Sequence, residues 1–222
     1  MPTARIEEYL EAIFKLQQET HPVSVSRLAE SLNLSAASVS EMLKRLKQNS
    51  LVHTHKSKGV CLTTKGEKLA KQTVRRHRLS ERLLTDILGY KWDEVHEEAC
   101  KLEHAIGPEL EEKIAKSLGD PQTCPHGHTI PREDGTFVEE KTRRLCDLEP
   151  GEKATIVRVS QEDSKMLHYL ATLGLMPNIE IEIEEIAPFG GPLLIRIKGK
   201  GVRGSKYALG REIASKILVN WR

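Results

Sequence analysis

The sequence predicts a mainly α-helical chain with a small amount of β structure, and three observations indicate this class. Apolar residues recur at helical spacing in successive segments between residues 5 and 118. Residues 119–141 contain repeated Pro and Gly without any period, which is typical of a connecting segment. From residue 144 onward, alternating or β-branched runs are separated by Gly and Pro turns. We therefore expect three domains, at residues 1–73, 74–141 and 142–222.

The expected first domain contains three short helices and a hairpin. The helices are predicted over residues 5–18, 24–32 and 35–49, and the hairpin over residues 51–63. Ser35 is expected to cap the third helix, because its side chain can accept a backbone N–H of the first turn. The predicted inward face of this helix consists of Val39, Met42, Leu43 and Leu46.

Helix, short turn, helix and hairpin, in that order, form the winged helix-turn-helix arrangement that reads DNA. The outward face of the third helix is small and polar, so its backbone can approach base edges in a major groove. The residues expected at the bases are Ser35, Ala37, Ser38, Ser40 and Glu41. Phosphate contacts are expected from Lys44, Arg45 and, at the hairpin tip, Lys58. The alternative is a solvated helical hairpin whose lysines only face water.

The rest of the chain predicts further helices and then a β module. A long helix is expected from Thr64 to about Leu88, followed by helices over residues 92–107 and 108–118. The final domain predicts strands at 154–159, 180–186 and 193–197, with one helix near residues 164–173.

Composition and charge narrow the functional classes. The chain has 222 residues, of which 38% are hydrophobic, and no apolar run approaches the ~20 residues of a membrane helix. Its four Cys do not make a disulfide framework, and the N-terminus lacks the apolar core of a signal peptide. We expect a cytoplasmic protein with no membrane partner.

The three parts of the chain differ in charge. Residues 1–73 carry 11 Lys and Arg against 7 Asp and Glu, residues 74–140 carry 9 against 15, and residues 141–222 carry 14 against 10. A basic head suits a polyanion and an acidic middle suits a cation, although blocks of this size also arise by chance.

Metal-ligand residues are concentrated on two predicted helices of the acidic middle. His77 and Glu81 are four residues apart and therefore share a helix face. The next helix carries a stripe of four donors: His96, Cys100, Glu103 and His104. A lone His is more often an ordinary interior residue, but six donors on two helices favour a metal site. Mixed nitrogen, sulfur and oxygen donors suit Fe(II), Mn(II), Co(II) or Ni(II).

Two long segments carry a resemblance to a known family. The stretch HRLSERLLTDILG followed by VHEEACKLEH, from His77 to His104, closely resembles the diphtheria-toxin-repressor family, which includes manganese-transport regulators. The segments LGLMPNIEIEIEEIAPFGGPLLIRI and YALGREIASKILV resemble the ferrous-transport accessory domain often fused to such repressors. The resemblance implies a winged helix-turn-helix domain, metal-binding dimerisation helices and a C-terminal SH3-like β-barrel.

The resemblance also implies ligand sets, position by position. The family's regulatory site corresponds to Glu8, Cys100, Glu103 and His104. Its ancillary site corresponds to His77, Glu81 and His96. Some manganese-responsive members instead build their second site from residues that correspond here to Glu81, Cys124, His126 and Asp163. The alternative for Cys124 and His126 is a Pro-rich turn in which both side chains merely pack.

The implied function is a homodimeric repressor that binds a double-stranded DNA operator when loaded with Fe(II) or Mn(II). Iron-responsive members typically have Met at position 8 and Cys at position 100, whereas manganese-responsive members have carboxylates at both. This chain combines Glu8 with Cys100, so the metal stays open between the two, with a slight preference for iron from the thiolate. Two other classes are considered: a metal-dependent hydrolase, which would need a base beside a substrate cleft, and a metal-trafficking module that does not bind DNA.

Overall fold

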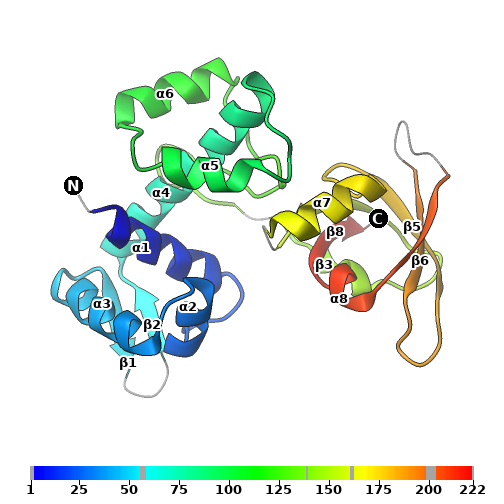
Figure 1. The fold of residues 1–222 in the computed structure, drawn as a ribbon, viewed down its shortest axis with the longest axis horizontal. Helices are drawn as coiled ribbons and strands as arrows, with labels where there is room; N and C mark the ends of the chain where they lie inside the picture. Colours follow the sequence, from blue (N-terminus) through cyan, green and yellow to red (C-terminus); the bar gives the residue numbers. More distant parts are fainter. Residues whose placement is uncertain (1–2, 56–58, 139, 161–162, 199–203, 222) are drawn as a thin grey trace. The chain divides into compact units, whose positions relative to one another are not determined.

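The computed structural model describes residues 3–55, 59–138, 140–160, 163–198 and 204–221 (Figure 1). The chain divides into two compact units, residues 1–77 with 131–136 and residues 78–130 with 137–222. Among the described residues, no helix has the length and apolar character needed to cross a membrane.

The first unit has the expected winged helix-turn-helix order. Its helices are α1 (Ala4–Gln17), α2 (Val25–Ser31) and α3 (Ala36–Gln48), followed by the antiparallel strands β1 (Val52–His55) and β2 (Gly59–Leu62) and the start of α4 (Thr64–Arg82). Ser35 caps α3 as predicted, because its Oγ accepts the Ser38 N–H at 3.1 Å. All four apolar residues predicted for the inward face of α3 are buried, so its polar face is left outward.

The second unit begins inside α4. The predicted long helix changes after Arg82 into a π-helical turn (Leu83–Ile87), in which the Leu88 N–H reaches the Leu83 carbonyl at 3.2 Å. α5 (Val95–Leu102) and α6 (Pro108–Ser117) follow. α5 is shorter than the predicted helix 92–107, and Trp92 instead lies before it, packed into the core of the C-terminal sheet.

The C-terminal part is a six-stranded antiparallel sheet with short helices. The order of its strands is β3-β8-β4-β5-β6-β7. Their bounds are β3 (Arg143–Arg144), β4 (Lys153–Val159), β5 (Glu180–Ile186), β6 (Leu193–Ile197), β7 (Lys206–Leu209) and β8 (Ile217–Trp221). The helical segments are a 3₁₀ turn (Leu145–Asp147), α7 (Ser164–Leu173) and α8 (Arg211–Ala214). Within the described strands the sheet is open, with β3 and β7 at its two ends, so the fold class is confirmed but the expected barrel is not closed.

Candidate metal centre

A short hairpin over residues 122–130 faces α4 within the second unit. Thr123 and Thr129 form an antiparallel bridge, and the Cys124 N–H donates to the His128 carbonyl at 2.8 Å. The loop closes when the Gly127 N–H donates to the Cys124 carbonyl at 2.9 Å. This part of the Pro-rich connection is therefore ordered, and it presents Cys124 and His126 from a tight turn.

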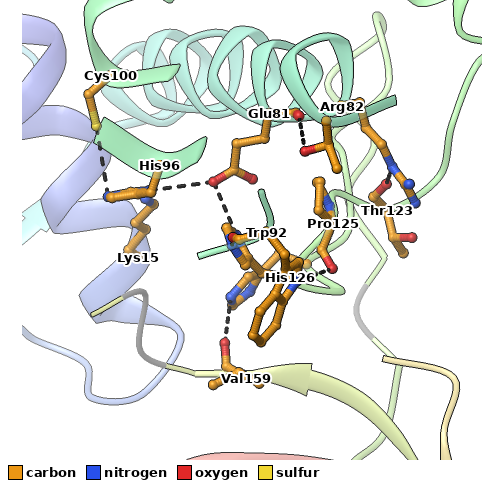
Figure 2. Close-up of polar contacts among 12 residues, drawn as sticks. Lys15, Glu81, Arg82, Trp92, His96, Cys100, Thr123, Pro125, His126 and Val159 are labelled. Atoms are coloured by element: carbon orange, nitrogen blue, oxygen red, sulfur yellow. Dashed lines mark hydrogen bonds and ion pairs between the residues drawn. The ribbon is translucent and has the colours of Figure 1, made fainter. Parts of the chain in front are cut away.

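Cys124 and His126 meet Glu81 of α4 in the interior of the second unit. The potential ligand atoms of these three residues all lie within 4.8 Å of one another, and all three side chains are buried. The distance from Glu81 Oε1 to His126 Nδ1 is 3.2 Å. Figure 2 shows the carboxylate and the imidazole facing each other. A buried carboxylate, thiol and imidazole at these distances match the chemistry of a transition-metal site.

The ring of His126 is oriented by a backbone group. Its Nε2 lies 2.8 Å from the Trp92 carbonyl oxygen, which can only accept a hydrogen bond, so Nε2 carries the proton (Figure 2). The indole Nε1 of Trp92 in turn donates to the Pro125 carbonyl at 2.8 Å. Metal-binding histidines commonly have their second nitrogen held in this way. His126 therefore directs Nδ1 at Glu81.

The pKa values of His126 and Cys124 are both raised, so these two potential ligands retain protons. Burial alone would lower the pKa of His126, but its polar contacts with Cys124 and Glu81 outweigh burial and raise the pKa to about 11. Burial and the negative charge of Glu81 raise the pKa of the Cys124 thiol. Because metal ligands must be deprotonated, a bound dication would displace these protons.

A second histidine approaches the same carboxylate from α5. His96 Nδ1 lies 3.4 Å from Glu81 Oε1, and the Cys100 thiol lies 3.8 Å from His96 Nε2 (Figure 2). The sequence allows two alternative ligand sets for the second metal site, and Glu81 belongs to both. In each set Glu81 contacts a histidine, His96 in one and His126 in the other. The structure does not separate the two alternatives, because both include Glu81.

The other predicted ligands are distributed over both units. Glu8 is exposed on α1 in the first unit. Glu103 and His104 end α5 in the second unit, with Glu103 Oε1 3.3 Å from His104 Nε2. A joint site of Glu8 with Cys100, Glu103 and His104 stays a prediction. Asp163 caps α7, where its Oδ1 accepts the Met166 N–H at 2.9 Å.

Glu11 is a buried carboxylate that is not among the predicted ligands. It lies on α1 one turn after Glu8, and its potential ligand atom is within 4.8 Å of that of His77, inside the first unit. A signal for it exists in the sequence, since Glu11 stands between the buried apolar residues Leu10 and Ile13. An acidic residue on the apolar face of a helix is seldom buried without a partner.

The predicted DNA-reading face of α3 is accessible. Ala37, Ser40, Glu41, Lys44 and Arg45 are exposed, and Ser38 is half-buried. Some of these residues also make contacts within α3: Arg45 Nη2 lies 2.7 Å from Glu41 Oε1, and the Ser40 hydroxyl donates to the Ala36 carbonyl at 2.8 Å. Lys58 lies outside the described residues.

Gly127 allows the ligand hairpin to pack against β4, and its replacement by alanine is expected to destabilise the protein. Gly127 has a φ of +88°, and a Cβ there would lie 1.9 Å from the Val157 carbonyl oxygen. Gly135 is a matched control, because its φ is +79° but no atom would lie within 4 Å of its Cβ. Gly127→Ala should lower the free energy of unfolding by about 1–3 kcal/mol more than Gly135→Ala, because only the former adds overpacking. Equal unfolding free energies by urea denaturation would contradict this.

Comparisons with known proteins agree with the fold and with metal binding by the middle of the chain. Residues 1–60 match the N-terminal DNA-binding domain of the iron-dependent repressors, residues 63–132 their metal-binding and dimerisation domain, and residues 143–220 the FeoA domain. The iron-dependent repressor IdeR of Mycobacterium leprae is 33% identical over 201 residues, which span 85% of this chain and 87% of the relative. The diphtheria toxin repressor of Corynebacterium jeikeium is 32% identical over 200 residues, which span 80% and 83% of the two chains.

Solved structures give the same result. A manganese-dependent transcriptional repressor in complex with manganese superposes with a TM-score of 0.90 at 36% identity, covering 98% of this chain and 100% of that chain. The manganese regulator SloR superposes with a TM-score of 0.80 at 33% identity, covering 98% of each chain. From its helices, its donor set and these matches, this chain belongs to the iron-dependent repressor family, the family of the diphtheria toxin repressor.

Proposed function

We propose that this chain is a homodimeric transcriptional repressor that binds its double-stranded DNA operator when loaded with Fe(II) or Mn(II). The observation that carries the proposal is the buried cluster of Glu81, Cys124 and His126, in a chain whose first unit exposes the polar face of α3. Members of this family are DNA-binding repressors and not enzymes, so the hydrolase alternative is set aside.

The donor types support a transition metal. Calcium and magnesium sites are built almost wholly from oxygen, whereas this cluster adds an imidazole and a thiol. The thiols of Cys100 and Cys124 favour Fe(II), and the carboxylates favour Mn(II). When bound, the ion would supply positive charge that holds the ligands together. Glu81, Cys124 and His126 would hold one ion, and Glu8 with Cys100, Glu103 and His104 would hold the regulatory one.

The regulatory ion is proposed to act by linking the two units. Glu8 belongs to the first unit and the other three ligands to the second, so shared ligation would restrict their relative motion. Coupling between two sites is typically about 1–3 kcal/mol and is reciprocal, so DNA should raise metal affinity by the factor by which metal raises DNA affinity.

Exposed apolar residues in the second unit support the homodimer. Ile87 and Leu88 at the end of the π-helical turn are 60% and 59% exposed, and Leu110 on α6 is 49% exposed. Large apolar side chains left in water commonly mark an association surface. A second copy of the chain would cover them and would place two α3 helices roughly 34 Å apart, or a multiple of that distance, in successive major grooves. We also propose that the protein acts in the cytoplasm, where the DNA is.

The direct test measures operator affinity against metal. Fluorescence anisotropy with a palindromic promoter fragment is recorded with Fe(II) under anaerobic conditions, with Mn(II), and with a chelator. The proposal expects affinity about 5–150-fold higher with metal than with chelator. Equal affinity in all three conditions would exclude a metal-activated repressor, and no DNA binding in any of them would favour the metal-trafficking alternative.

Lys44 is expected to contact a phosphate, so Lys44→Ala should weaken binding to all DNA sequences alike. Each lost phosphate contact reduces the slope of log K against log salt by about 0.9. Lys113 on α6 is the control, because it is an exposed lysine that pairs with Glu109 on its own helix. The measurement is anisotropy at four or five salt concentrations. An unchanged slope for Lys44→Ala would mean that this residue is not at the DNA backbone.

A further inference from the structure

Two arginines of α4 hold the hairpin that carries Cys124 and His126. Arg82 Nε donates to the Thr123 carbonyl at 2.7 Å, as Figure 2 shows, and Arg78 Nη1 donates to the Thr129 carbonyl. Thr123 and Thr129 are bridge partners on opposite arms of the hairpin. The two guanidinium groups therefore form hydrogen bonds with both arms of the hairpin, at residues that pair with each other.

The positions of the two arginines on α4 place their hydrogen bonds to the hairpin close to the proposed metal ligands. Arg78 and Arg82 are four residues apart and share one helix face, and Glu81 lies between them in the sequence. Thr123 directly precedes Cys124, so the carbonyl that Arg82 holds is one peptide bond from a potential ligand. The arginines thus fix the hairpin relative to the helix turn that supplies Glu81.

The surroundings of the two arginines argue against a purely electrostatic role. A cation beside a dication site weakens metal binding by repulsion, unless its charge is offset. Arg82 Nη1 lies 3.3 Å from Asp86 Oδ2, and the buried Arg78 guanidinium lies 5.9 Å from the ring centroid of Phe137. One N–H group of each arginine donates to a carbonyl oxygen of the hairpin. The Asp86 carboxylate offsets the charge of Arg82, and hydrogen bonds to the hairpin are what both arginines have in common at the site.

We propose that Arg78 and Arg82 are positioning residues that preassemble the Glu81, Cys124 and His126 cluster before the metal enters. They act on the backbone of the ligand hairpin and not on the ion. This rests on the proposed function, because it takes the cluster to be a metal site.

The test is the affinity of the cluster for Co(II), read from the thiolate-to-cobalt absorption in the near ultraviolet. A Cys100→Ser background is used so that the band reports Cys124. Arg82→Ala is expected to weaken binding about 10–100-fold, as is typical when an outer partner of a ligand is lost. Lys71→Ala is the control on the same helix, where Lys71 pairs with Glu67 at 2.8 Å, and it should bind like the background protein.

The sign of the change decides between positioning and charge. Loss of a positive charge alone would tighten Co(II) binding, so unchanged or tighter binding by Arg82→Ala overturns the proposal. Arg82→Lys keeps the charge and one flexible donor, and it should restore part of the lost affinity; no recovery counts against the hydrogen bond to Thr123. For the buried Arg78, the milder Arg78→Lys is used, with the same expected direction. Metal-free Arg82→Ala should also show faster amide exchange across residues 122–130.

Cys124→Ser distinguishes this proposal from the proposed metal site itself. If Cys124→Ser leaves the band and the affinity unchanged, the cluster is not the metal site and both proposals fail. If Cys124→Ser abolishes the band while Arg82→Ala binds as the background does, only the positioning role fails.

Discussion

Glu81→Gln is expected to weaken metal binding at the buried cluster by about 100-fold or more. Glu81 Oε1 faces both His126 and His96, at 3.2 and 3.4 Å, so the substitution removes the negative charge that both imidazoles share. Loss of an outer partner of a ligand already costs about 10–100-fold, and Glu81 is a ligand in this proposal. Competition with a fluorescent chelator for Mn(II) or Co(II) measures the effect. Glu98→Gln is the control, since Glu98 is a more exposed carboxylate on α5 that pairs with Lys101.

The same variant should change how the metal-free protein responds to pH. The pKa of His126 is raised to about 11, so the stability it contributes is fully present below its ordinary pKa of 6.5 and is lost as pH rises through about 11. Without the Glu81 charge, only the contact with Cys124 is left to raise this pKa against burial, so the contribution of His126 becomes smaller. Breaking a buried pair typically costs about 3–5 kcal/mol of unfolding free energy.

The measurement is urea denaturation of the apo protein between pH 7 and 8.5, a range that lies above the ordinary pKa of histidine, 6.5, and below that of a thiol, 9.0. Wild-type stability should fall by at most about 1.4 kcal/mol per pH unit from His126, and that fall should be smaller in Glu81→Gln. Parallel stability curves for the two proteins would show that His126 is not charged in the fold.

Glu103→Ala is expected to abolish the activation of DNA binding by metal. Glu103 is buried, and its Oε1 lies 3.3 Å from His104 Nε2. Two of the proposed regulatory ligands, a carboxylate and an imidazole, are therefore adjacent. The 5–150-fold difference in operator affinity between metal and chelator should therefore shrink to none. Affinity in chelator should stay at the wild-type level, because α3 is untouched.

Glu109→Ala is the matched variant for this measurement, since Glu109 is an exposed carboxylate on α6. Operator binding is followed by anisotropy over a range of Mn(II) concentrations. A Glu103→Ala protein that metal still activates to the wild-type extent would place the regulatory ligands elsewhere.

Helices and strands that are determined by their own side-chain pattern could be predicted from the sequence. Helical spacing and the Ser35 cap predict α3, and alternation predicts β5 and β6 with the bounds that the structure has. β7 and β8 are missed, because their short runs show little alternation and β8 is defined by its pairing with β4. Such a strand owes its state to a partner about 60 residues away in the sequence, which no local pattern records.

The donor types of the candidate site could also be predicted, but not their arrangement. The resemblance names Glu81, Cys124, His126 and Asp163 as one possible set, and the structure brings the first three together. The contacts that orient the ligands involve backbone carbonyls. The Trp92 carbonyl accepts a hydrogen bond from His126, and the Thr123 carbonyl, next to Cys124, accepts one from Arg82. Every residue has a carbonyl, so the sequence carries no sign of which ones are used. Asp163 is a residue whose type fits two roles, since an acidic residue before a helix can be a metal ligand or a helix cap. In the structure its side chain caps α7.

The π-helical turn after Arg82 has a consequence for how chain length can vary in this family. A π turn holds one residue more than an α turn, so deleting one residue from 83–87 could convert it to regular α-helix. Everything before the deletion, Glu81 included, would keep its orientation. The apolar pair Ile87 and Leu88 would also stay close to its present direction, because the turn takes up the missing residue and the rotation of about 100° that a deletion causes in a regular α-helix does not arise. A change of one residue in chain length at this turn would therefore leave in place both the helix face that carries Glu81 and the exposed apolar pair that follows it.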